Sequence, residues 1–146
     1  MSTLVLPRVI YDDLCAHGEQ AYPEECCGAL LGMPTAEGWS ISASVRAANA
    51  SRESARRRYH IAPGELVAIV RDARRRNLEV AGFYHSHPDH PAQWSGTDLE
   101  EAHWIGCSYV ITQVEKGRAS ATNAFLLAGT REEDKRFEPL AIEIVA

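Results

Sequence analysis

Two histidines, His85 and His87, are separated by one residue at the end of the apolar run 78–87. The run is typical of a β-strand, in which residues two apart project from the same face. We therefore expect the two imidazoles to lie close enough together to bind one metal ion. Pro88 follows directly and is predicted to end the strand, because proline has no amide hydrogen to donate to a central ladder.

Ser95 and Asp98 follow at fixed distances and complete the pattern H-x-H-x7-S-x2-D. A carboxylate is a ligand that zinc accepts, and two histidines with one carboxylate leave a fourth position for water, as in catalytic zinc sites. At ordinary composition this combination arises by chance on the order of once in a million start positions. However, a histidine pair on a strand also occurs without metal, and Ser95 and Asp98 also suit the start of a helix. The pattern by itself leaves both interpretations open.

A carboxylate upstream supplies the remaining group that a metallohydrolase needs. Glu24 and Glu25 directly precede the apolar segment 26–31, which is predicted to be a short buried strand. A carboxylate beside a zinc-bound water can act as the general base. Zinc deaminases combine H-x-E with P-C-x-x-C, and the second element is absent from this sequence, which disfavours deamination.

Together these residues resemble the JAMM/MPN+ metalloproteases, in which a glutamate ahead of a Cys-Gly-aliphatic strand accompanies H-x-H-x7-S-x2-D. The resemblance covers most of the chain, from about Leu4 to the strand around Ile111, and the motif is complete. It implies one zinc ion, Zn2+, with water as its fourth ligand and three protein ligands, His85, His87 and Asp98. It further implies that Glu25 is the general base and that Ser95 donates a hydrogen bond to the oxyanion.

The same resemblance implies a substrate class. JAMM/MPN+ proteins cleave peptide or isopeptide bonds at the C-terminus of ubiquitin or ubiquitin-like proteins. Short prokaryotic-type members resemble those that act on small sulfur-carrier proteins ending in Gly-Gly. Two other functions remain open: a zinc peptidase acting on other peptides, associated with cell walls or phages, and a non-catalytic MPN scaffold, for which loss of a ligand would be the sign.

The composition agrees with a compact enzyme. The chain has 146 residues, which we expect to form a single domain, 1–146, with a core of its own. Apolar residues make up 45% and charged residues 24%, and no apolar run approaches the length of a membrane span. The first seven residues do not resemble a secretory signal, so we expect a cytoplasmic location. Four cysteines suit that compartment as free thiols.

The net charge of −5 argues against general affinity for nucleic acids. Positive charge is nevertheless concentrated in the middle of the chain, at Arg52, Arg56, Arg57, Arg58, Arg71, Arg74, Arg75 and Arg76. A solvated loop and helix face explains these residues most simply. The alternative is a dock for an acidic protein partner, such as a ubiquitin-like protein, because guanidinium groups suit carboxylates.

The periodicity of the chain predicts the elements that must position these side chains. Helices are expected at 7–22, 63–77 and 97–104, and strands at 26–31, 39–48, 78–87, 107–114, 120–127 and 137–145. Thr97 and Glu100 have the spacing of a capping box at the start of the third helix. The segment 49–58 is polar and irregular, and is the candidate loop for holding a substrate.

Strands interleaved with helices indicate an α/β fold. We expect a three-layer sandwich in which helices flank a mixed β-sheet, and the resemblance implies the cytidine-deaminase-like architecture of the JAMM/MPN domain. Asp98 then falls at the first helical position, where the helix dipole favours an ionised carboxylate. One position departs from the family pattern: Trp94 precedes the motif serine, where bacterial relatives often have proline.

Overall fold

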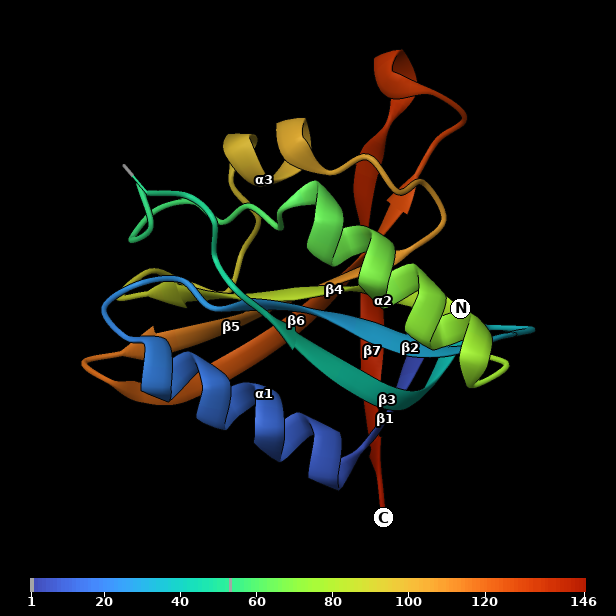
Figure 1. Cartoon of the computed structure of the whole chain (residues 1–146), viewed down its shortest axis with the longest axis horizontal. Helices are drawn as coiled ribbons and strands as arrows, with labels where there is room; N and C mark the ends of the chain where they lie inside the picture. Colours follow the sequence, from blue (N-terminus) through green and yellow to red (C-terminus); the bar gives the residue numbers. More distant parts are fainter. Residues whose placement is uncertain (1, 53) are drawn as a thin grey trace.

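The computed structural model describes residues 2–52 and 54–146, so expectations that concern Met1 and Glu53 lie outside the described residues. Figure 1 shows the arrangement of the strands and helices. In chain order these are β1 (Thr3–Pro7), α1 (Arg8–Ala21), β2 (Cys27–Thr35), β3 (Gly38–Ala47), α2 (Pro63–Arg75), β4 (Glu79–Pro88), α3 (Gly96–Glu101), β5 (Ser108–Glu115), β6 (Arg118–Ala128), the 3-10 helix η1 (Glu132–Asp134) and β7 (Arg136–Val145).

The strands form a closed barrel in the order β1-β3-β2-β4-β5-β6-β7. β1 closes it by pairing in parallel with both β3 and β7. β4 and β5 are also parallel, whereas the other neighbouring strands are antiparallel. The expected α/β class and the mixed sheet are therefore confirmed. The three-layer sandwich is not, because a flat layer would leave an unpaired strand at each edge of the sheet.

Two helices cover opposite faces of the strands that carry the site. In α1, Ile10 and Leu14 pack with Leu30 of β2 in one buried cluster. In α2, Ile69 and Ala73 pack in a second cluster with residues of alternate parity on the same strands, such as Leu31 and Phe83. Figure 1 shows α1 and α2 on the two sides of the sheet. Because both faces are covered, β2 and β4 are apolar along most of their length rather than alternating.

The first strand, β1, was not predicted from the sequence. Its five residues alternate between half-buried and buried positions, and Leu4 and Leu6 are fully buried. Pro7 ends this strand and is the N-cap of α1, which therefore begins at Arg8 rather than at the expected proline. All the helices and strands that were predicted are present, and their ends differ from the expected positions by a few residues.

The four cysteines, Cys15, Cys26, Cys27 and Cys107, are free thiols, as expected. Among the described residues, no helix combines the length and the apolar character that crossing a membrane requires.

Candidate metal centre and reaction cavity

The two motif histidines lie near the end of β4, a strand that is paired on both sides. His85 pairs with Cys27 of β2 and with Ile111 of β5, so its backbone is fixed in the middle of the sheet. Both imidazoles project from the same face and are buried, with 2% of His85 and 7% of His87 exposed. Their Nε2 atoms are 3.1 Å apart. The predicted pairing of the two rings on one face of a strand is therefore present.

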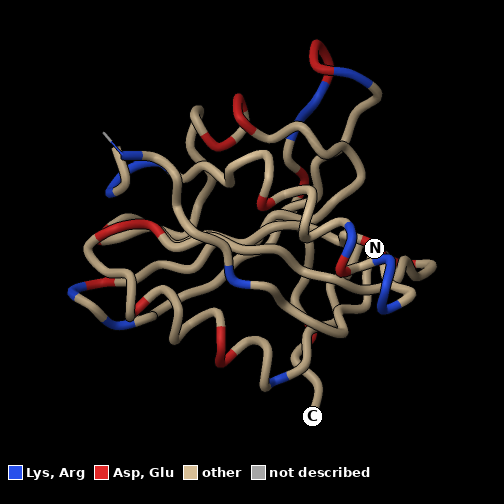
Figure 2. Tube along the Cα trace, viewed as in Figure 1, with Lys and Arg blue, Asp and Glu red and all other residues tan. Residues whose placement is uncertain are grey.

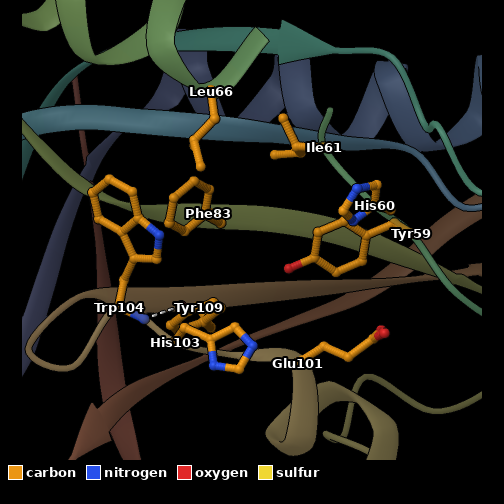
Figure 3. Close-up of a pocket in the computed structure, with 9 residues that line it drawn as sticks. All are labelled: Tyr59, His60, Ile61, Leu66, Phe83, Glu101, His103, Trp104 and Tyr109. Carbon is orange, nitrogen blue, oxygen red and sulfur yellow. Dashed lines mark hydrogen bonds between the residues drawn. The ribbon is translucent and has the colours of Figure 1, made fainter. Parts of the chain in front are cut away.

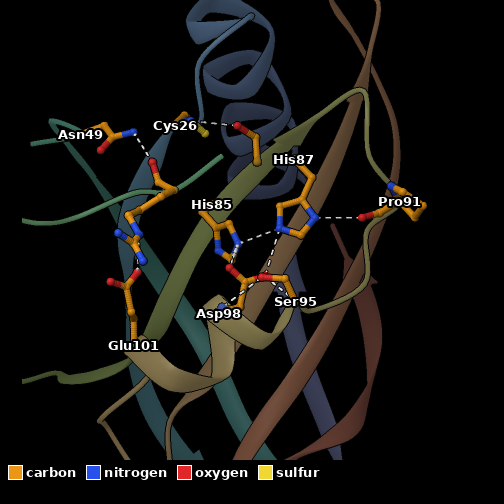
Figure 4. A network of polar contacts seen from close by, with 10 residues as sticks. Cys26, Asn49, His85, His87, Pro91, Ser95, Asp98 and Glu101 are labelled. Carbon is orange, nitrogen blue, oxygen red and sulfur yellow. Dashed lines mark hydrogen bonds and ion pairs between the residues drawn. The ribbon is translucent and has the colours of Figure 1, made fainter. Parts of the chain in front are cut away.

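Asp98 joins the two rings, as Figure 4 shows. Its Oδ1 lies 3.2 Å from Nε2 of His85 and its Oδ2 lies 3.1 Å from Nε2 of His87. The carboxylate belongs to α3. The residue that caps this helix differs from the one expected from the sequence. Ser95 is the N-cap: its Oγ accepts from the amide of Asp98 at 3.0 Å, and Asp98 Oδ2 accepts from the amide of Ser95 at 2.9 Å.

The capping box is thus formed by Ser95 and Asp98, not by Thr97 and Glu100, and Asp98 is the third helical residue rather than the first. Both pairs have the same sequence spacing. The pair that forms is the one whose carboxylate also meets the two histidines, so tertiary contacts decide between two local alternatives.

The two histidine rings are held in different ways. Nδ1 of His87 donates to the carbonyl of Pro91 at 2.9 Å, which leaves the lone pair of Nε2 facing Asp98 and His85. The His85 ring is stacked on Tyr59, with ring centroids 4.5 Å apart. Its Nδ1 is buried and has no hydrogen-bond partner among the described residues. Stacking on Tyr59 and the contact of Nε2 with Asp98 therefore orient this ring, and its Nδ1 takes no part.

The donor set fits a metal ion. One ligand atom from each of His85, His87 and Asp98 lies within 4.8 Å of the other two. The set contains two imidazole nitrogens and one carboxylate, and three protein ligands leave a coordination position for water or substrate. When both rings carry their proton on Nδ1, each can point the lone pair of its Nε2 at one cation.

The protonation equilibria of the three groups are coupled through Asp98. Burial alone would raise the pKa of Asp98, but hydrogen bonds with His85 and His87 hold it well below its usual range. Burial lowers the pKa of His85 despite the nearby carboxylate. Burial also acts to lower the pKa of His87, but its contacts with Asp98 and Pro91 outweigh burial and raise it. The carboxylate is therefore ionised over the ordinary pH range, which is the form that binds metal.

Glu25 lies two residues before the start of β2, and 4% of its surface is exposed. Its Oε1 is buried and has no hydrogen-bond partner among the described residues. Burial raises the pKa of Glu25 to about 8, and the charges of Asp98 and Glu101 act in the same direction, opposed by His87. Glu24 is exposed. Of the two candidate bases, the structure thus places Glu25 in the interior of the site.

Three contacts hold the backbone around Glu25. The Cys26 amide donates to Oγ of Ser86, the residue between the two histidines, at 2.8 Å. The Glu25 amide donates to the carbonyl of Ala55 at 2.7 Å, and the Glu25 carbonyl accepts from Nδ2 of Asn49 at 3.1 Å. The backbone of Glu25 is therefore attached both to β4, which carries the two histidines, and to the loop that follows β3.

Two hollows flank the metal centre. The first, which we call the reaction cavity, has a volume of about 460 Å³ and is lined by Glu25, Arg57, His87, His90, Pro91, Gln93, Trp94, Ser95 and Thr97. The second has about 300 Å³ and aromatic walls, among them Phe83, Trp104 and Tyr109 (Figure 3). Tyr59 lines the second hollow and stacks on His85, so the two spaces lie on different sides of the ligand set. The candidate base and Ser95 open into the reaction cavity.

Sequence reasoning missed three residues that support the site. Asn49 ties the loop after β3 together, Tyr59 stacks on a ligand, and the carbonyl of Pro91 orients the other ring. A single asparagine or tyrosine in a polar segment carries no spacing signal, and a backbone carbonyl carries none at all. Trp94, the departure from the family pattern, packs against Phe137 with ring centroids 5.6 Å apart and lines the reaction cavity.

Comparison with protein families gives a match over most of the chain. The model of the family described as prokaryotic homologues of the JAB domain matches residues 7–128, a range that contains all the candidate site residues. Among curated proteins, desampylase from Haloferax volcanii is 32% identical over 124 residues, which is 82% of this chain and 86% of the relative.

Solved structures give the same picture of the fold. A protein from Desulfitobacterium hafniense, solved in solution, superposes with a TM-score of 0.80 over 98% of this chain and 94% of its own. At 24% identity that likeness concerns the fold alone. A protein from Salinibacter ruber is 39% identical, with a TM-score of 0.69 over 94% of this chain and 91% of its own.

Proposed function

This chain belongs to the prokaryotic homologues of the JAB domain, and from that premise we propose that it is a zinc metallopeptidase of the JAMM type. The proposed reaction is hydrolysis of a peptide or isopeptide bond at the C-terminus of a ubiquitin-like protein, of the sulfur-carrier kind that ends in Gly-Gly. The proposed metal ligands are His85, His87 and Asp98, with Glu25 and Ser95 as the catalytic residues.

One observation supports this proposal most strongly: a buried carboxylate with an unpartnered oxygen lines the same cavity as His87, one of the proposed metal ligands. Burying a polar atom without a hydrogen bond costs roughly 1–3 kcal/mol, and more for a charged group. Glu25 Oε1 is such an atom. A structural role would not require this arrangement, whereas a general base must present a lone pair to the water that it deprotonates.

When bound, zinc supplies a Lewis acid that polarises the substrate carbonyl and lowers the pKa of water toward about 7. Glu25 accepts a proton as the oxygen of that water attacks the carbonyl carbon. The Ser95 hydroxyl uses its lone pair to accept from the Asp98 amide, so its hydrogen remains free to donate to the oxyanion. The carbon–nitrogen bond then breaks, and Glu25 returns the proton to the leaving nitrogen.

The substrate class rests on family resemblance and on the relative. The name desampylase denotes an enzyme, which supports an enzyme over a non-catalytic scaffold, and in this chain the complete set of proposed ligands meets at one point. A peptidase that acts on unrelated peptides is the alternative.

The test is incubation with a small carrier protein ending in Gly-Gly, fused at its C-terminus to one amino acid, followed by intact-mass measurement. We expect the mass of the free carrier, no product after treatment with a chelator, and recovery when zinc is restored. Glu25→Gln should keep its zinc and lose about 10²–10⁴-fold in rate, whereas Glu24→Gln, at the exposed neighbouring position, should be mild. Cleavage of unrelated peptides at equal rates would overturn the proposed substrate class.

Metal content tests the ligand set independently of turnover. Protein purified without chelator should contain one zinc per chain, and His87→Ala or Asp98→Ala should abolish tight binding because two ligands rarely hold zinc. Full zinc occupancy in both variants would contradict the assignment, and iron in place of zinc would contradict the choice of metal.

A further inference from the structure

We propose that Arg57 forms a carboxylate-binding subsite on the leaving-group side of the reaction cavity. The chain would then favour substrates whose released amine carries a carboxylate close to the bond that is cut. This inference rests on the proposed hydrolase function and adds to it a preference for the chemistry of the released component.

The position of Glu25 determines which side of the cavity receives the leaving group. Because Glu25 returns a proton to the leaving nitrogen, the released component must lie against Glu25. The loop after β3 is fastened to the same residue: the Glu25 amide donates to the carbonyl of Ala55 at 2.7 Å, and Asn49 Nδ2 donates to the carbonyls of Glu25 and Arg58, each at 3.1 Å. A side chain that this loop directs into the cavity therefore meets the released component.

Arg57 is the arginine of this loop that lines the reaction cavity. Its backbone is fixed by a turn in which its amide donates to the carbonyl of Ser54 at 2.9 Å. Arg58 faces elsewhere and pairs with Glu101 at 3.4 Å. Arg52 and Arg56 line an adjoining hollow of about 400 Å³, which Arg57 also borders. Of the three consecutive arginines, Arg57 thus lines both hollows, Arg56 lines the adjoining one, and Arg58 pairs with Glu101.

The charge distribution favours an anion in this position. Figure 2 shows basic residues along much of the loop, which stands at one edge of the molecule. The lining of the reaction cavity contains one carboxylate, that of the proposed base, Glu25. Its other polar side chains, such as those of His90, Gln93 and Thr97, can donate hydrogen bonds. A guanidinium binds a carboxylate through two parallel hydrogen bonds, so geometry as well as charge selects this ligand.

Two sources can supply the carboxylate. One is the α-carboxylate of a single amino acid released from the end of a carrier protein. The other is an acidic side chain on the residue that follows the scissile bond. The chemistry that Arg57 recognises is the same in both cases, and substrates that separate them are simple to make.

The experiment uses three fusions of one carrier protein, ending in Gly-Gly-Ala with a free carboxylate, in Gly-Gly-Ala amide, and in Gly-Gly-Asp amide. They share everything before the scissile bond. We expect kcat/KM for the free acid or for the aspartyl amide to exceed that for the alanyl amide by about tenfold or more, since a hydrogen bond to a charged group is worth about 1.5–3 kcal/mol. The favoured fusion identifies the source of the carboxylate.

Variants assign the preference to Arg57. Arg57→Gln should bring the ratio of kcat/KM between the favoured fusion and the alanyl amide close to one. Arg57→Lys should keep part of this preference, because the charge stays and the paired geometry is lost. Arg56→Gln removes the same charge from the same loop but lies outside the reaction cavity, so its ratio should match that of the unmodified protein. Thermal melting of each variant checks that the exposed substitutions leave the fold intact.

The outcomes separate this inference from the proposed function. Equal hydrolysis of all three fusions would overturn the subsite and leave the hydrolase in place. A preference that survives Arg57→Gln, or that Arg56→Gln abolishes equally, would overturn the assignment to Arg57. Hydrolysis of none of the three by the zinc-loaded protein would overturn the proposed function, and the subsite with it.

Discussion

Glu25 is buried in a place where an ionised carboxylate is unfavourable, with 4% of its surface exposed and one oxygen unpartnered among the described residues. Burial raises its pKa from 4.5 to about 8. In the metal-free protein, the folded state therefore holds a proton that the unfolded state releases between these two values. Above the unfolded pKa of 4.5, the carboxyl group of Glu25 therefore reduces the stability of the metal-free fold.

The sign of this effect gives a prediction for the metal-free protein. The contribution of Glu25 to the free energy of unfolding is greatest below the unfolded pKa of 4.5. It falls as pH rises to about 8, because over this range the carboxyl group ionises in the unfolded state and stays protonated in the folded state. Each pKa unit corresponds to about 1.4 kcal/mol. In chelator, Glu25→Gln should therefore be more stable than the unmodified protein by several kcal/mol at pH 8, and by little at pH 5. Urea denaturation at both pH values measures the difference, and an equal difference at the two would contradict it.

Ser95 combines two tasks that different substitutions can separate. Its Oγ accepts from the amide of Asp98 and caps α3, and its hydrogen is proposed to serve the oxyanion. Alanine at an N-cap costs about 0.5–2 kcal/mol, whereas glycine costs only a few tenths. We expect Ser95→Ala and Ser95→Gly to lose about 10²–10³-fold in turnover alike, with zinc content unchanged. If turnover instead follows stability, with a severe loss in Ser95→Ala and a slight loss in Ser95→Gly, Ser95 acts only as a capping residue.

At the scale of elements, the loop after β3 depends on one side chain. Asn49 Nδ2 donates to the carbonyls of Glu25 and Arg58, and its Oδ1 accepts from the amides of Ser51 and His60. The loop thereby carries both Tyr59, which stacks on the proposed ligand His85, and the attachment of the proposed base, Glu25. Irregular backbone of this kind is positioned by side-chain hydrogen bonds because it has no ladder of its own.

Replacing Asn49 should therefore impair the site more than the fold. Asn49→Asp keeps the two acceptor contacts but turns an oxygen toward backbone carbonyls, and Asn49→Ala removes every hydrogen bond of this side chain. We expect each to lower turnover by roughly 10–100-fold through misplacement of the base, and to speed trypsin cleavage at the loop arginines. Ser51→Ala retains its backbone amide and is the matched control. Unchanged cleavage and turnover in both Asn49 variants would show that the loop is held by other contacts.

The elements of the site show how far sequence reasoning reaches. His85 and His87 were identifiable because period-two geometry is local. Adjacency to an apolar strand indicated Glu24 and Glu25 alike, and only the family resemblance singled out Glu25. The cap was misassigned because Ser95 with Asp98 and Thr97 with Glu100 share one spacing, and only contact with the histidines separates them. The roles of Asn49 and Tyr59 depend on how a loop folds back on the sheet, for which no pattern in the sequence gives a signal.

At the scale of the whole molecule, the feature that the sequence did not predict is closure of the sheet. Leu4 and Leu6 of β1 are fully buried, and their strand pairs with β3 on one side and β7 on the other. The other six strands and the three α-helices were predicted from local periodicity. A five-residue strand next to a proline has little periodicity of its own, and its partner β7 lies more than a hundred residues away.

Closure predicts that a short terminal strand contributes strongly to stability. Leu6→Ala should lower the free energy of unfolding by about 2–5 kcal/mol, the usual range for a buried leucine. Val9, close by in α1, is 74% exposed, and Val9→Ala should stay within about 0.5 kcal/mol of the unmodified protein. Equal effects of the two substitutions in urea denaturation would show that β1 is only loosely attached.

The parallel pairing of β1 with β7 has a mechanical consequence. Thr3 lies opposite Ala141 and Pro7 opposite Val145, so the chain enters this pair at one end and leaves it at the other. A pulling force that arrives through residues before β1 and departs through residues after β7 is directed along both strands. Their backbone hydrogen bonds then share the load simultaneously, instead of opening one after another as in a peeled hairpin. The strand pair that closes the sheet is also the one that resists such a force.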